Sequence, residues 1–171
     1  MITVRRVRPA EYVEAGEITA SAWSPREPIE TAEWIGFHDR VADVAGRDAV
    51  APVFVAVMEG KIVGSVTLEL ESRVTDQANP APLGSDEAHV RLLAVAPEAR
   101  RRGVATALMA HCVATARREG KARLTLNTSA HNAGAQSFYE AIGFQRRNDE
   151  VPADGSALVS YELDVGPVVD S

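Results

Sequence analysis

The stretch HVRLLAVAPEARRRGVAT, residues 89–106, constrains the fold of this chain more than any other. Residues 90–95 are apolar except for Arg91, a pattern typical of a strand that is buried on both faces. Pro97 ends the strand because proline cannot donate a hydrogen bond to a sheet. A helix of period 3.6 then begins near Gly103. Its apolar side consists of Val104, Leu108, Cys112 and Thr115.

The turn between this strand and this helix has the composition of an anion site. The first turn of a helix carries backbone N–H groups without helical partners and a partial positive charge. Gly103 lets a ligand approach that backbone closely, and three cations precede it at Arg100, Arg101 and Arg102. The sequence therefore predicts a cradle for a phosphate group.

A second informative stretch, HNAGAQSFYEAIGF at residues 131–144, has the pattern of another helix. Asn132 and Tyr139 are seven residues apart, so they share a helix face at a separation of roughly 10 Å. Ala135 lies between them and keeps that face shallow. One long ligand could contact both polar side chains. Alternatively, Asn132 caps the helix and Tyr139 packs half-buried.

Charge and composition exclude several classes of function. A net charge of −6 argues against a general nucleic-acid binder, which needs basic surface. No run approaches the roughly 18 apolar residues that span a bilayer, and the N-terminus lacks a signal-peptide apolar region. We therefore expect a cytoplasmic protein without a membrane partner. Four scattered histidines and the single Cys112 predict no metal site. The glycine motifs of ATP and dinucleotide sites are also missing.

The rest of the chain alternates between strand and helix patterns. Besides the strand at 89–95, we expect strands at 2–8, 53–58, 62–70, 123–127, 144–147 and 157–163. Helices are expected at 10–23, 30–45 and 103–118 and from Ser129 or His131 to Ile142. In the first helix, the inward positions are Tyr12 or Val13, Ile18 and Ala22.

This order, β-α-α-β-β-β-α-β-α-β-β, predicts one mixed α/β (α+β) domain over residues 1–165. Its sheet has about seven mostly antiparallel strands and is flanked by about four helices. Residues 166–171 are expected to be disordered. The polar loop at 71–87 is longer than most connections, which indicates a mobile segment or a functional one such as a substrate lid.

The two informative stretches together resemble the GNAT superfamily of N-acetyltransferases. Arg100-x-x-Gly103-x-Ala105 matches that family's pyrophosphate signature Q/R-x-x-G-x-G/A, and Asn132 with FYEAIGF at 138–144 resembles its second motif. The resemblance implies a single-domain GNAT-like fold that binds acetyl-CoA as cosubstrate. The implied cofactor-binding residues are Leu93, Ala94, Val95, Arg100, Arg101, Arg102, Gly103, Val104, Ala105, Thr106, Asn132, Ala135 and Tyr139.

The same resemblance implies a role for each part of this set. The amides at 103–106 and the arginines hold the pyrophosphate, and the backbone of Leu93 and Val95 pairs with the pantetheine arm. An amide near Leu93 or Ala94 polarises the thioester carbonyl. Tyr139 protonates the departing thiolate.

The acceptor amine must lose a proton, because an alkylammonium titrates near pKa ~10.4. In the family a glutamate near the start of the central strand often takes that proton, and here His89 stands at that position. A histidine titrates near pKa ~6.5, which suits the task. Glu87 lies on the same side of the strand, two residues earlier. The candidates are therefore His89, Glu87, either Glu69 or Glu71, or no dedicated base.

Trp23 and Trp34 lie in the two helices that wall the acceptor site in this family. Together with the acids Glu69, Glu71, Asp86 and Glu87, they suggest an acidic-rimmed cleft for a cationic small molecule or peptide amine. The alternative is two core tryptophans and a solvated loop.

The sequence thus predicts an acetyl-CoA-dependent N-acetyltransferase that moves the acetyl group directly to a primary amine of a small molecule or peptide. The alternatives are a catalytically weak acyl-CoA-binding sensor or regulatory subunit, and an unrelated nucleotide-binding domain. The family's habits also make a homodimer an expectation.

Overall fold

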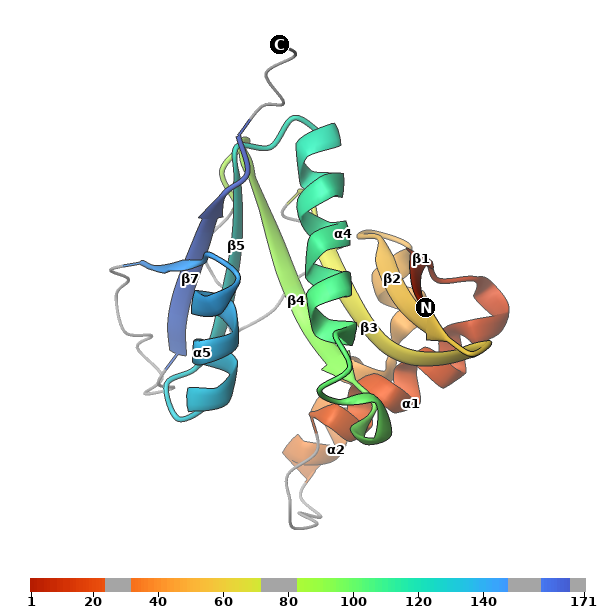
Figure 1. Cartoon of the computed structure of the whole chain (residues 1–171). Coiled ribbons are helices and arrows are strands. Elements are labelled where there is room, and N and C mark those ends of the chain that lie inside the picture. The colour runs from red at the N-terminus through yellow and green to blue at the C-terminus, as the bar shows by residue number, and fades with distance from the viewer. Residues whose placement is uncertain (24–31, 72–82, 148–157, 167–171) are drawn as a thin grey trace. The chain divides into compact units, whose positions relative to one another are not determined.

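The computed structural model describes residues 1–23, 32–71, 83–147 and 158–166 (Figure 1). Within them the strand order is β1 (Ile2–Arg6), β2 (Val53–Met58), β3 (Lys61–Glu69), β4 (Glu87–Val95), β5 (Arg123–Ser129), β7 (Leu158–Asp164) and β6 (Gln145–Arg146). The α-helices are α1 (Tyr12–Ala22), α2 (Ala32–Ala42), α3 (Val44–Asp48), α4 (Val104–Arg118) and α5 (Ala133–Ala141).

These elements confirm the predicted order and the mixed seven-stranded sheet. The short helix α3 was not part of the predicted order. One helix was expected over 30–45, but α2 ends at Ala42 and a new helix starts after Asp43. The Asp43 side chain accepts a hydrogen bond from the Gly46 amide and so caps α3. Residues 72–82 of the predicted loop and 167–171 of the predicted tail lie outside the described residues.

The chain divides into two compact units. The first unit comprises residues 1–68 and 92–112, and the second comprises residues 69–91 and 113–171. In the first unit, β1, β2 and β3 pair antiparallel, with a register shift between Ala56 and Val57. One cluster of its core is formed by Val7, Ala15, Val44, Val53, Val55 and Ile62.

Helix α1 buries mainly small residues, namely Ala15, Gly16, Thr19 and Ala20. A Cβ at Gly16 would collide with the backbone of Ala42, so a glycine is needed where α1 meets the end of α2. Tyr12 and Ile18 pack against the core cluster as predicted, whereas Val13 is exposed. The inward face of α1 is therefore set by close helix packing as well as by large apolar residues.

Gly64 on β3 allows the start of α4 to pack closely on the first unit's sheet. A Cβ at Gly64 would lie 2.9 Å from the Ala94 carbonyl oxygen and 2.9 Å from the Val104 side chain. Just beyond β4, the Ala96 amide donates to the Val63 carbonyl at 2.8 Å. The junction between β4 and α4 is thus held against β3 by contacts that leave no room for a side chain at residue 64.

In the second unit, β5 pairs parallel with the first half of β4 and antiparallel with β7. The parallel register runs from Glu87 opposite Arg123 to Val90 opposite Leu126. Figure 1 shows α5 beside β5 and β7. The rings of Tyr139 on α5 and Tyr161 on β7 are 6.2 Å apart, which fixes that contact.

Candidate functional site

The arginine-glycine loop joins β4 to α4 as predicted. A single turn of 3₁₀ helix at Pro97–Ala99 follows the strand, and α4 starts at Val104. Arg101 and Gly103 have φ values of 60° and 83°, in the left-handed region. The predicted apolar side of α4 is confirmed, since Val104, Leu108, Cys112 and Thr115 are all buried.

The geometry of this loop suits an anion. The side chains of Arg100, Arg101 and Arg102 are exposed, and Gly103 is exposed with open space where a Cβ would lie. The Gly103 carbonyl accepts from the Ala107 amide at 3.0 Å, which closes the first turn of α4. Exposed guanidinium groups beside an open helix start can hold a phosphate group.

Leu92 gives β4 an irregularity that the sequence did not reveal. Its φ is 52°, a left-handed conformation that is uncommon for a leucine. Residues 88–91 are all buried, whereas Leu92 and Leu93 are both half-buried, so the burial of the strand changes there. Irregularities of this kind take backbone groups out of the regular ladder and often lie beside active sites. No sequence signal marks the position, because neither glycine nor asparagine occupies it.

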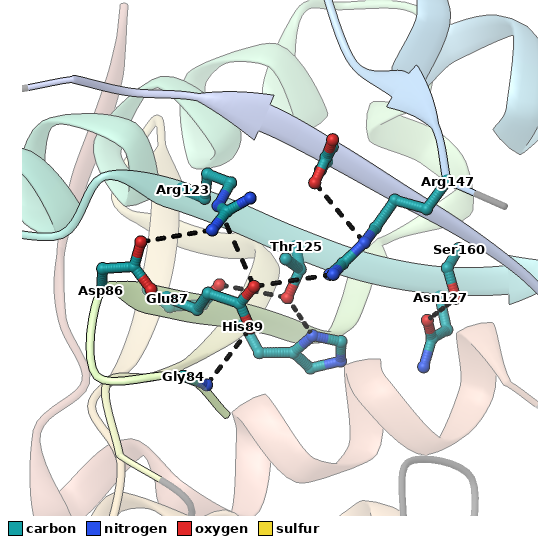
Figure 2. Close-up of polar contacts among 11 residues, drawn as sticks. Gly84, Asp86, Glu87, His89, Arg123, Thr125, Asn127, Arg147 and Ser160 are labelled. Atoms are coloured by element: carbon teal, nitrogen blue, oxygen red, sulfur yellow. Dashed lines mark hydrogen bonds and ion pairs between the residues drawn. The ribbon is translucent and has the colours of Figure 1, made fainter. Parts of the chain in front are cut away.

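The second unit carries a polar cluster on one face of β4, β5 and β7 (Figure 2). Glu87 lies 3.6 Å from an Arg147 nitrogen and 4.0 Å from Arg123 Nε. Arg123 also pairs with Asp86 at 3.3 Å, and Arg147 with Glu162 at 3.4 Å. The acids around Glu87 are therefore balanced by guanidinium groups, and this part of the predicted acidic rim is not a block of unpaired negative charge.

His89 lies on the same face as Glu87, as predicted from their spacing. His89 is buried, with 4% of its area exposed, and its Nδ1 lies 2.7 Å from the Thr125 hydroxyl oxygen. Burial, with the positive charges of Arg91 and Arg147, lowers the pKa of His89 from 6.5 to about 3. The ring is therefore neutral at physiological pH.

Helix α5 places Asn132 and Tyr139 in packing and capping contacts. Asn132 is the N-cap, and its side-chain oxygen accepts from the Ala135 amide at 3.0 Å. Tyr139 is 8% exposed and packs near the rings of Phe138, Phe144 and Tyr161. Capping and packing are thus structural facts, and the ligand contacts of these residues stay predictions.

The remaining predicted site residues have varied surroundings. Trp23, which follows α1, is 42% exposed, and the side chain of Trp34 lies outside the description. Glu71 is exposed. Glu69 is 2% exposed and accepts a hydrogen bond from Arg91 Nε at 2.6 Å. Glu69 is thus engaged by a buried cation.

Among residues 1–23, 32–71, 83–147 and 158–166, no group of three or more His, Cys, Asp or Glu side chains could hold a metal ion. In the same ranges, no helix combines the length and apolar character that crossing a membrane requires.

Comparisons with known proteins show the family of this chain. The model of the Acetyltransferase (GNAT) family matches residues 11–144. The 5-NmdU N-acetyltransferase of Pseudomonas phage PaMx11 is 28% identical over 158 residues, which are 92% of this chain and 97% of that protein. The [ribosomal protein bS18]-alanine N-acetyltransferase of Escherichia coli K12 is 38% identical over 74 residues, 41% of this chain and 50% of that protein.

A solved structure shares the fold. The PaiA N-acetyltransferase of Thermoplasma acidophilum, in complex with coenzyme A, superimposes with a TM-score of 0.71 at 15% identity. The match covers 96% of this chain and 99% of that one.

Proposed function

Because this chain belongs to the acetyltransferase (GNAT) family and is an acyltransferase, we propose that it moves the acetyl group of acetyl-CoA directly to a primary amine of a small molecule or peptide. The observation that carries the proposal is the junction of β4 and α4, where left-handed Arg101 and Gly103 precede an open helix start. The names of the phage and Escherichia coli relatives support a nitrogen acceptor.

The residues of the loop fit the pyrophosphate of acetyl-CoA. Three exposed guanidinium groups supply positive charge, and the backbone at 103–106 supplies helix-start amides. Acetyl-CoA supplies an acetyl thioester, the activated acyl group. The irregular β4 at Leu92 supports the proposal that the backbone at Leu93, Ala94 and Val95 serves the pantetheine arm and the thioester carbonyl.

Direct transfer forms one C–N bond and breaks one C–S bond. The sulfur gains a proton, for which we assign the Tyr139 phenol, and the amine loses one. We propose that the amine gives its proton to the face of β4 that holds Glu87 and His89 (Figure 2), either directly or through water. Cys112 is buried, and burial raises the pKa of its thiol to about 12, which disfavours the thiolate and supports a mechanism without an acyl-enzyme.

The test is an amine panel with acetyl-CoA, read by release of free CoA and by mass of the acetylated product. The panel includes an alanine-starting peptide, an aminomethyl nucleoside, a polyamine and a lysine analogue, with acetate-like anions as controls. We expect amine-dependent CoA release at a ratio of one CoA per acetyl amide. A burst of CoA without amine, with the acetyl group left on the protein, would contradict direct transfer. Acetyl-CoA binding without turnover on any amine would instead favour a sensor.

A further inference from the structure

Two polar contacts of Thr125 bear on which nitrogen of His89 carries a proton. The two residues are cross-strand partners on β4 and β5. The Thr125 hydroxyl lies 3.3 Å from the Ala88 carbonyl oxygen and 2.7 Å from His89 Nδ1 (Figure 2). A carbonyl oxygen only accepts, and a hydroxyl has a single hydrogen to donate. When that hydrogen goes to Ala88, the contact at 2.7 Å requires the proton of the imidazole to be on Nδ1.

The other ring nitrogen, Nε2, is then an acceptor. Figure 2 shows it on the ring edge that points away from Thr125. Within the described part of the chain, no buried side-chain nitrogen or oxygen lacks a hydrogen-bond partner. The His89 ring makes its hydrogen bond through Nδ1, so Nε2 is not fully buried and can receive a ligand N–H.

We propose that Thr125 is a positioning residue that holds His89 as the neutral Nδ1–H tautomer, so that Nε2 accepts a hydrogen bond from the acceptor amine. This inference rests on the proposed acetyltransferase function and names how its amine is oriented. With one N–H directed at Nε2, the nitrogen lone pair points away from the ring and is available for attack.

The charges around the ring favour a neutral amine over an ammonium ion. Arg91 and Arg147 are the cations that act on His89, and Glu87 and Glu162 face the same region as partners of Arg147. The burial and the positive charges that disfavour a protonated imidazole also disfavour an ammonium ion beside the ring. His89 thus orients the amine, and the amine's proton leaves to solvent along the Glu87 face.

The tautomer can be tested without any turnover. In protein labelled with ¹⁵N and ¹³C at histidine, the His89 signal is assigned by its loss in His89→Gln, and its ring shifts distinguish Nδ1–H from Nε2–H. We expect Nδ1–H in the wild type and in Thr125→Ser, and a mixture or the other tautomer in Thr125→Val. An Nε2–H tautomer in the wild type would overturn the proposal. Complete absence of enzyme turnover would sink the proposed function but not this assignment.

Kinetics test the role of the tautomer. We expect Thr125→Val to lower kcat/KM for the best amine of the panel about tenfold, the scale of one lost hydrogen bond, with KM for acetyl-CoA unchanged. Thr125→Ser should restore the rate. Thr128→Val is the matched control, because residue 128 is on the same strand and faces the other side. Equal kcat/KM for the amine in Thr125→Val and the wild type, or equal losses in the two valine variants, would overturn the proposal.

Discussion

Arg91 on β4 donates a hydrogen bond from Nε to Glu69 Oε2 on β3 at 2.6 Å, and the two side chains keep 7% and 2% of their area exposed. Burying a pair of this kind costs desolvation, which the charge of the partner helps to offset. Glu69 was one candidate for contact with the amine. Because Glu69 is paired with Arg91, replacing Glu69 should first of all change the stability of the protein.

We expect Arg91→Met to lower the free energy of unfolding by about 3–5 kcal/mol, because it leaves the Glu69 carboxylate buried without that partner. The double variant Glu69→Leu/Arg91→Met should recover much of the loss, since it removes both charges. Urea denaturation measures each value. Arg123→Met is the matched control: its pair with Asp86 is nearly half exposed on both sides, so about 0–1 kcal/mol is expected. Similar losses in Arg91→Met and Arg123→Met would contradict the argument.

Gly103→Ala tests the proposed pyrophosphate loop. Its φ of 83° strains any residue with a Cβ by about 1–2 kcal/mol, and the added methyl narrows the approach to the helix start. We expect KM for acetyl-CoA to rise about tenfold with little change in KM for the amine.

Gly120→Ala is the control for this variant. Gly120 has a φ of 73° and equally open space where a Cβ would lie, but it follows α4 at the opposite end. It should show a similar loss of stability by thermal unfolding and an unchanged KM for acetyl-CoA. If both variants raise that KM equally, the effect comes from strain and not from the cofactor.

Sequence patterns could predict most of the fold because the spacing of apolar residues within each element indicates its type and its buried face. The apolar run before Pro97 and the period-3.6 pattern after Gly103 gave the strand, the loop and α4 as observed. The spacing of Glu87 and His89 likewise placed them on one face of β4.

What could not be predicted depends on contacts between distant segments. The left-handed Leu92 has no local signal. The low pKa of His89 arises from burial and from Arg91 and Arg147, and Arg147 is 58 positions away along the chain (147 − 89). The guanidinium partners of Glu87 come from β5 and from the segment after β6, so the sequence pattern around Glu87 could not predict its ion pairs.

Tyr139→Phe tests the proposed general acid. Loss of the hydroxyl should lower kcat roughly a hundredfold or more, the scale of general acid catalysis, with KM for acetyl-CoA retained. Tyr161→Phe is the control, because it removes a phenol from the same aromatic cluster whose hydroxyl donates to Glu140 at 2.9 Å. That variant should lose about 1 kcal/mol of stability and keep its kcat. An unchanged kcat in Tyr139→Phe would assign Tyr139 to packing alone.

Histidine 89 should also contribute a pH dependence to stability. Its pKa falls from 6.5 to about 3 on folding, so between these values the unfolded chain binds more protons than the folded one. The stability that His89 contributes is therefore complete above about pH 6.5 and is lost as the pH falls toward 3. From pH 7 to pH 4 this loss amounts to about 3 kcal/mol.

His89→Gln removes this titration and leaves the other groups in place. The charged neighbours of the ring, Arg91, Arg147, Glu87 and Glu162, are the same in both proteins. The wild type should therefore lose about 3 kcal/mol more than His89→Gln between pH 7 and pH 4, measured by urea denaturation at each pH. Parallel stability curves for the two proteins would show that the folded ring titrates near its ordinary pKa. The neutral acceptor at Nε2 would then not persist in mild acid.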